Sequence, residues 1–167
     1  LAADDGLAGL HLLGVMPSRD FGDASNQDLS CLDGLVAFPP GSAVTLQSLM
    51  DHIPNGSAGL GGEVFSYDSA ARFEAPVAPS GFNGPVHPTV FPGGDNPARR
   101  GVDAYLFHGA NPLAFRRWLA SAVEYAREQS PSLVFINAWN EWAEGAAIEG
   151  TVLPDVFPSR HEPEASR

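Results

Sequence analysis

One stretch of this sequence predicts most of its architecture: Leu133-Val134-Phe135-Ile136-Asn137-Ala138-Trp139-Asn140-Glu141-Trp142-Ala143-Glu144-Gly145. It opens with a short apolar run rich in β-branched and aromatic residues, typical of a strand buried on both faces of a parallel sheet. A polar cluster follows where that strand would end. In parallel α/β barrels the carboxyl ends of the strands bear the active site. We therefore predict an α/β fold with a candidate site at the end of this strand.

Two carboxylates in this cluster, Glu141 and Glu144, are three residues apart. A helical turn after the strand would place both on one side. Two carboxylates that share a cavity cannot both ionise easily, so one becomes an acid beside a base. Glycoside hydrolysis requires such a pair. The same spacing is also common on solvated helix faces, and that alternative stays open.

Two tryptophans and two asparagines frame the carboxylates. Trp139 and Trp142 can offer flat apolar faces to the C–H surface of a sugar, although tryptophans are more often core residues. Asn137 and Asn140 can hydrogen-bond sugar hydroxyls or hold the glutamates in place. A merely solvated face would not need two tryptophans. The combination therefore gives an active site about the same weight as a structural role.

The run from Phe135 to Gly145 closely resembles the signature of the WbsX-like family. That family is found in surface-polysaccharide and lipopolysaccharide biosynthesis, and its members are often described as glycosyltransferases. It is related to the endo-α-mannosidase and endo-α-mannanase glycoside hydrolases, which are (β/α)8 barrels. The resemblance implies that Glu141 is the base that assists the sugar 2-hydroxyl, through a 1,2-anhydro intermediate. It implies that Glu144 is the general acid/base, with retention of configuration and with no metal or organic cofactor.

A second informative stretch covers residues 86–100, where a strand leads into a glycine turn followed by Asp95, Asn96 and Arg99. It resembles a family segment that ends in Pro-Gly-Trp-Asp-Asn-Thr-x-Arg, with Gly94 here in place of the Trp. Asp and Asn suit hydroxyl recognition, and Arg can grip a carboxylate or orient an acid. We expect these three residues to bind substrate. A capped turn with an exposed arginine pair is the alternative.

Three further segments, residues 9–15, 32–40 and 63–68, are expected to be strands. The family has a strand similar to the third one that ends in Tyr, which implies that Tyr67 reaches the substrate. A core tyrosine with a satisfied hydroxyl is the alternative.

Two helices are expected, one among these strands and one directly before the final strand. The clearer helix begins at Asn111-Pro112, because Asn suits the N-cap and Pro the first helical position. It ends near Ser130, and the last strand follows at once, so this order predicts a parallel sheet. A shorter helix is expected over residues 43–53.

The composition argues against some classes of binding partner. The chain has 167 residues and a formal net charge of −11. The acidic balance argues against nucleic acid or an anionic membrane surface as a partner. The resemblance to the WbsX-like family implies an oligo- or polysaccharide substrate. The single cysteine, Cys31, excludes an intrachain disulfide, and no transmembrane run is present. The compartment is left open, with the cytoplasm slightly favoured.

The resemblance implies that residues 1–150 are the C-terminal half of a (β/α)8 barrel, because a complete barrel needs about 250 residues. Residues 151–167 are expected to be a poorly ordered tail. A half barrel exposes sheet edges, so the missing half-barrel or another chain is an expected partner. The implied function is cleavage or transfer of glycosidic bonds, by a glycoside hydrolase or glycosyltransferase. The alternative is a non-catalytic carbohydrate-binding or structural half-domain.

Overall fold

A computed structural model describes residues 9–16, 28–39, 46–53 and 61–149. Its largest element is a four-stranded sheet in which every neighbouring pair of strands is parallel. The strands follow one another in chain order and are β1 (Leu13–Met16), β2 (Gly34–Ala37), β4 (Val86–Val90) and β6 (Phe135–Ile136). The predicted α/β class with parallel strands is confirmed.

Side chains of the neighbouring strands pack closely over β2 at Gly34. Every residue of β2 is buried between β1 and β4. A Cβ placed on Gly34 would lie 2.8 Å from Leu13 Cδ2 and 3.2 Å from His87 Nε2. Glycine therefore lets the side chains of both neighbouring strands cross β2 at this point.

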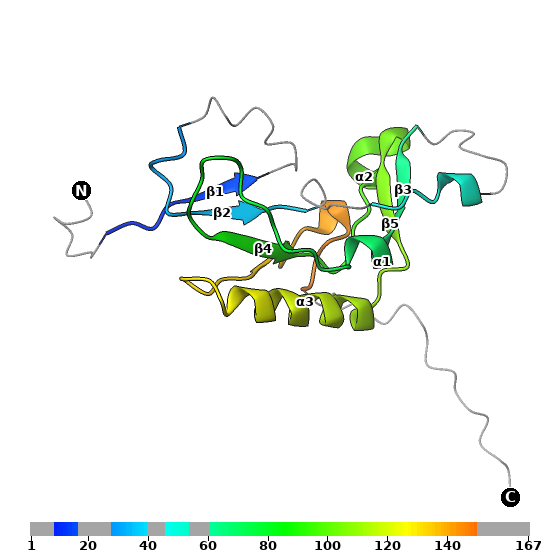
Figure 1. Ribbon diagram of the computed structural model, residues 1–167. Helices are drawn as coiled ribbons and strands as arrows, with labels where there is room; N and C mark the ends of the chain where they lie inside the picture. The colour runs from blue at the N-terminus through cyan, green and yellow to red at the C-terminus, as the bar shows by residue number, and fades with distance from the viewer. Residues whose placement is uncertain (1–8, 17–27, 40–45, 54–60, 150–167) are drawn as a thin grey trace, which may run out of the picture.

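A second, two-stranded parallel sheet pairs β3 (Glu63–Ser66) with β5 (Tyr105–His108). In Figure 1 this pair stands at the end of the molecule toward which β1, β2 and β4 point. Two short elements precede β5, the helix α2 (Pro97–Arg100) and the 3-10 turn η3 (Gly101–Asp103). The second sheet therefore lies at the carboxyl edge of the main sheet.

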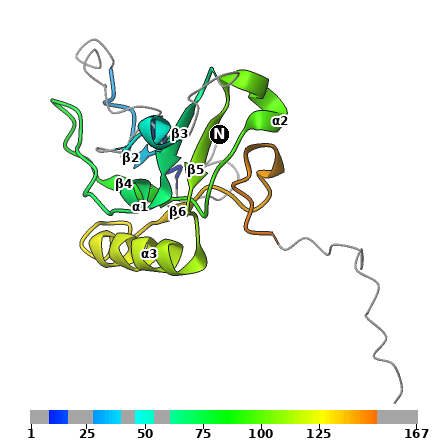
Figure 2. The ribbon, with the colours of Figure 1, turned by 90° about the vertical axis from the view of Figure 1, so that its right-hand side faces the viewer.

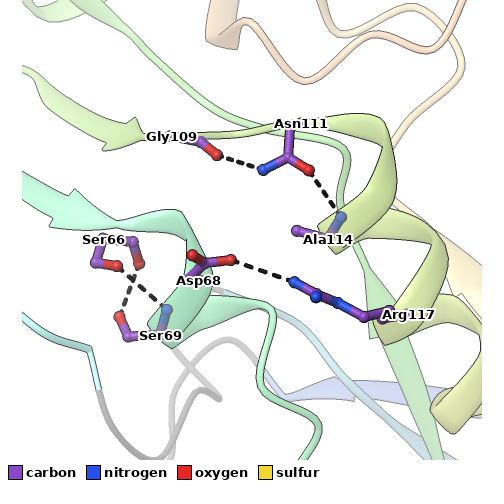
Figure 3. A network of polar contacts seen from close by, with 7 residues as sticks. All are labelled: Ser66, Asp68, Ser69, Gly109, Asn111, Ala114 and Arg117. Carbon is purple, nitrogen blue, oxygen red and sulfur yellow. Dashed lines mark hydrogen bonds and ion pairs between the residues drawn. The ribbon is translucent and has the colours of Figure 1, made fainter.

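The helix predicted from Asn111 is confirmed as α3 (Pro112–Ala126), although it ends at Ala126 and not near Ser130. It runs along the main sheet against β4 (Figures 1 and 2). Asn111 Oδ1 accepts a hydrogen bond from the Ala114 amide at 2.9 Å, and Asn111 Nδ2 donates to the Gly109 carbonyl at 2.9 Å. Figure 3 shows this cap beside the short helix α1 (Tyr67–Ala70), whose N-cap is Ser66. An ion pair of 3.7 Å between Arg117 and Asp68 joins the two helices.

The main core lies where α1, α3 and β5 meet the end of β4. Its aromatic members pack edge to face, as aromatic rings prefer. The ring of Phe91 lies 4.9 Å from that of Phe107 and 5.1 Å from that of Trp118. A smaller cluster of Met16, Leu35, Ala37 and Val86 packs strands β1, β2 and β4 against one another. The two clusters hold the carboxyl ends of the strands in place.

Several expected elements differ from the structure. The helix predicted over residues 43–53 is wrong for the described part, because only η2 (Met50–His52) is helical and Ser48 forms an antiparallel bridge with Phe65. The strand expected over residues 63–68 ends at Ser66, because the Ser66 hydroxyl caps a helical turn. The strand β5 was not predicted, although its residues Tyr-Leu-Phe-His form an apolar, aromatic run.

Three further predictions concern barrel closure, the C-terminal tail and membrane spans. No closed barrel is formed by the residues that the structure describes. The tail predicted for residues 151–167 lies outside them. Within the described segments, no helix is both long and apolar enough to span a membrane.

Candidate functional site

The two stretches singled out in the sequence meet at the carboxyl edge of the main sheet. Residues 91–96 follow β4, and residues 137–149 follow the adjacent strand β6. The Asp95 amide donates a hydrogen bond of 2.7 Å to the Glu144 carbonyl, which joins the two loops. Figure 2 shows the loop after β6 lying beside α2. Parallel strands place the chain that follows each of them at one edge, and this is why the two stretches come together.

The loop after β6, residues 137–149, is closed by its own backbone. The Ala138 amide donates to the Ala146 carbonyl at 3.0 Å, and the Glu149 amide donates to the Trp139 carbonyl at 2.8 Å. Both predicted catalytic glutamates, Glu141 and Glu144, lie in the segment that these two hydrogen bonds close. We call residues 137–149 the glutamate loop.

Glu144 lies at the end of the 3-10 turn η4 (Trp142–Glu144) of the glutamate loop. Its side chain is only 18% exposed, and Oε1 lies 2.5 Å from Nη2 of Arg99 on α2. An arginine beside a mostly buried carboxylate compensates its charge and sets its orientation. The structure thus joins one predicted catalytic residue to one predicted binding residue.

Glu141 stands just before η4 and is partly buried. Its carbonyl accepts a hydrogen bond of 3.0 Å from the Ala146 amide. Glu141 therefore occupies the same closed loop as Glu144, separated from it by a single tight turn. The turn is 3-10 in place of the α-helical turn that we expected.

The two tryptophans of the glutamate loop are not core residues. Trp139 is 64% exposed and Trp142 is 49% exposed. Trp142 Nε1 donates a hydrogen bond of 3.2 Å to Glu149 Oε2. An exposed indole face suits stacking against a sugar, and the hydrogen bond to Glu149 fixes the ring edge of Trp142.

The two asparagines of the glutamate loop differ in exposure. Asn137 is partly buried. Its backbone amide continues the sheet by donating a hydrogen bond of 2.9 Å to the Val90 carbonyl. The peptide bond from Asn137 to Ala138 is cis. Asn140 is exposed, and its carbonyl accepts from the Trp142 amide at 3.0 Å.

Asp95 and Asn96 have different environments although they are adjacent. Asp95 is exposed beside Gly145, where a Cβ would lie 2.8 Å from Asp95 Oδ1. Asn96 is fully buried, and its Oδ1 accepts 2.9 Å from the Tyr105 amide. Its Nδ2 has no hydrogen-bond partner among the described residues. Asn96 thus fixes β5 against the loop after β4.

Tyr67 lies away from this group. It is fully buried in the core, and its hydroxyl donates a hydrogen bond of 2.6 Å to the Phe91 carbonyl. Burial, together with the negative charge of Asp68, raises the pKa of Tyr67 far above its usual value. This environment matches the alternative of a core tyrosine with a satisfied hydroxyl.

Sequence reasoning missed two side chains at this edge. Glu149 holds Trp142, and its position after the second tryptophan carried no signal of that contact. His108 ends β5 and lies at the same edge, and recognising the Tyr-Leu-Phe-His run as a strand would have found it. In the described part of the chain, no three His, Cys, Asp or Glu side chains gather in a way that could hold a metal ion.

A family model described as Glycosyltransferase WbsX matches residues 1–155. The chain belongs to the WbsX glycosyltransferase family. The resemblance stated from the sequence is confirmed. The match covers both loops of the candidate site, including Arg99 and Glu144.

Two curated relatives from Xanthomonas campestris pv. campestris, both named Uncharacterized protein WxcX, are similar to this chain. The protein of strain B100 is 34% identical over 149 residues, and that of a second strain is 33% identical over 149 residues. Each alignment covers 87% of this chain and 20% of the relative. The chain therefore spans about a fifth of the length of these relatives.

Proposed function

We propose that this WbsX-family chain contains part of a carbohydrate-active site that cleaves or transfers glycosidic bonds in polysaccharide metabolism. The observation that carries the proposal is the Arg99–Glu144 ion pair, which links the two polar loops at the carboxyl edge of the sheet. The four parallel strands in chain order support a further proposal, that the chain is the C-terminal half of a (β/α)8 barrel.

The paired-glutamate mechanism assigns each carboxyl group a proton. Glu144 gives its proton to the glycosidic oxygen while the C1–O bond breaks. Glu141 takes the proton of the 2-hydroxyl, whose oxygen attacks C1 and forms a 1,2-anhydro sugar. Water or an acceptor hydroxyl then opens this ring at C1, giving up its proton to Glu144, and Glu141 returns its proton to O2.

The residues around the pair have supporting roles in this proposal. Arg99 orients Glu144 through the 2.5 Å contact and stabilises the carboxylate that remains once Glu144 has given up its proton. Trp139 and Trp142 stack on the sugar with their exposed faces. Asp95, Asn137 and Asn140 bind hydroxyl groups, and Asn96 places the Asp95 loop against β5.

The second candidate function is carbohydrate binding without catalysis. The exposure of both tryptophans favours it, since sugar stacking requires their faces but not the glutamates. The two functions differ in how they respond to Glu→Gln changes. If the site is catalytic, Glu144→Gln removes turnover but leaves sugar stacking intact. If the site only binds, Glu144→Gln barely changes the affinity. Trp139→Ala removes binding under either function.

The deciding experiment measures turnover of an α-mannoside with a good leaving group. It compares this chain with a version extended upstream, each beside its Glu144→Gln variant, with Glu128→Gln on the exposed surface as the matched control. We expect turnover that Glu144→Gln abolishes and Glu128→Gln leaves unchanged. Equal turnover in both variants would exclude Glu144 as the acid/base. Tryptophan-dependent binding without any turnover would favour the binding function.

A further inference from the structure

A cavity of about 460 Å³ lies beside the glutamate loop, between the loop after β4 and the end of β5. Four glycines line it: Gly93, Gly94, Gly109 and Gly145. The backbone at Gly109 (φ +83°) and Gly145 (φ +59°) favours glycine over residues with a side chain. We call this space the glycine cavity. Its volume is within the range of about 300–1,000 Å³ found for small-molecule sites.

The walls of the glycine cavity are held by hydrogen bonds. The Phe107 amide donates a hydrogen bond of 2.7 Å to the Gly94 carbonyl, and the Asp95 amide donates one of 2.7 Å to the Glu144 carbonyl. The Gly109 carbonyl accepts from Asn111 Nδ2, the side chain that also caps α3 (Figure 3). A cavity formed before the ligand arrives requires little ordering when it binds.

The lining chemistry selects among sugar-containing ligands. Asp95 and His108 are the titratable side chains among the described residues that line the cavity, and none of those residues is Lys or Arg. Arg99, on the adjacent α2, is already paired with Glu144. Diphosphate recognition relies on cationic side chains or on helix N-termini that present free amides. A carboxylate in a chain of net charge −11 repels such a group.

We propose that the glycine cavity binds a neutral sugar ring of a glycan, next to the ring held by the glutamate loop. Asp95 accepts hydrogen bonds from the hydroxyl groups of this sugar ring, and His108 makes a further polar contact with it. The glycines have no side chains, so the ring can approach their backbone closely. The inference rests on the proposed carbohydrate function. It adds that the substrate presents at least two neutral sugar units here and not a nucleotide diphosphate.

The test is a titration followed by 1H–15N NMR on the full chain, because glycine amides and tryptophan indoles report separately on the two positions. The probes are neutral α-linked disaccharides of mannose, glucose, galactose and rhamnose, the matching monosaccharides, and GDP-mannose. Ala110→Leu narrows the cavity from its exposed rim, His108→Ala removes the ring at its edge, and Ala98→Leu on the exposed α2 is the matched control.

We expect at least one disaccharide to shift the amides of Gly93, Gly94 and Gly109 together with the tryptophan indoles. Ala110→Leu and His108→Ala should each weaken this binding by about tenfold or more, while Ala98→Leu should not. Indole shifts with silent cavity glycines would overturn the inference and leave the carbohydrate function standing. Cavity shifts with GDP-mannose alone would overturn the neutral-ligand assignment. No shift at either position with any probe would count against both proposals.

Discussion

Arg99 Nη2 lies 2.5 Å from Glu144 Oε1, although the two residues are on different loops and 45 positions apart in the sequence. Glu144 is mostly buried at this contact, whereas Arg99 is 54% exposed. An ion pair with one exposed member contributes little to stability, typically about 0–1 kcal/mol. Its effect should therefore be on the orientation of the carboxyl group.

Replacing Arg99 should affect activity far more than stability. Arg99→Ala leaves Glu144 without its orienting partner, and we expect turnover to fall by up to about 100-fold, the cost of a misplaced reacting group. The melting temperature should change little. Arg100→Ala, the next residue on α2, is the matched control. Equal losses from both variants would contradict a specific role for Arg99.

Glu149 should act through Trp142. Glu149→Ala removes the acceptor of the 3.2 Å indole hydrogen bond, so the exposed ring loses its fixed edge and sugar affinity should fall. Glu149→Gln keeps an acceptor oxygen and should retain most of the affinity. The measurement is a titration with disaccharide followed by tryptophan fluorescence, with Glu128→Ala as control. If Gln and Ala have the same effect, the indole contact is not the cause.

Tyr67 should behave as a structural residue. Tyr67→Phe removes the buried 2.6 Å hydrogen bond to the Phe91 carbonyl, and we expect a loss of about 1–3 kcal/mol in the free energy of unfolding. Tyr125→Phe is the control, because its hydroxyl is 3.4 Å from the Val86 carbonyl and should matter less. Denaturant unfolding measures both. A drop in sugar affinity without loss of stability would restore the substrate-binding role.

His87 should make stability depend on pH near neutrality. Burial lowers the pKa of this side chain below 6.5, with a smaller contribution from His11. The unfolded chain therefore binds more protons below pH 6.5 than the folded chain does, so stability should fall as the pH drops through that value. Thermal unfolding between pH 7 and 5.5 should show this slope. It should flatten in His87→Phe but not in His52→Gln, and an unchanged slope in His87→Phe would refute the assignment.

Much of the site was predictable because its residues are close in sequence. An apolar run that leads into Asn, Trp and Glu indicated a strand and its carboxyl end, and β6 with the glutamate loop lies there. The length of β6 was not predictable, since only two of its residues pair with β4. Local pattern marks where a strand occurs, but the partner strand decides how much of it forms a ladder.

Errors arose where tertiary contacts override local pattern. Residues 46–49 have a helical pattern, yet Ser48 pairs with Phe65 of β3 and the segment is not helical. Tyr67 ends an apolar run, but the Ser66 cap turns the chain into α1 and directs the ring into the core. The Ser48 bridge and the packing of the Tyr67 ring depend on neighbours that are distant in sequence, which local propensity does not contain. The turn into α1 is local, because its cap is the adjacent Ser66.

The sequence by itself determined the parallel α/β class, the start of α3 at Asn111 and the position of the polar loops, because these depend on apolar periodicity and capping within a few residues. Only the tertiary structure decided that Arg99 reaches Glu144, that Trp142 is held by Glu149, and that four glycines line one cavity. These relationships join loops after different strands. Strand order and register bring such loops together, and they follow from packing over the whole chain.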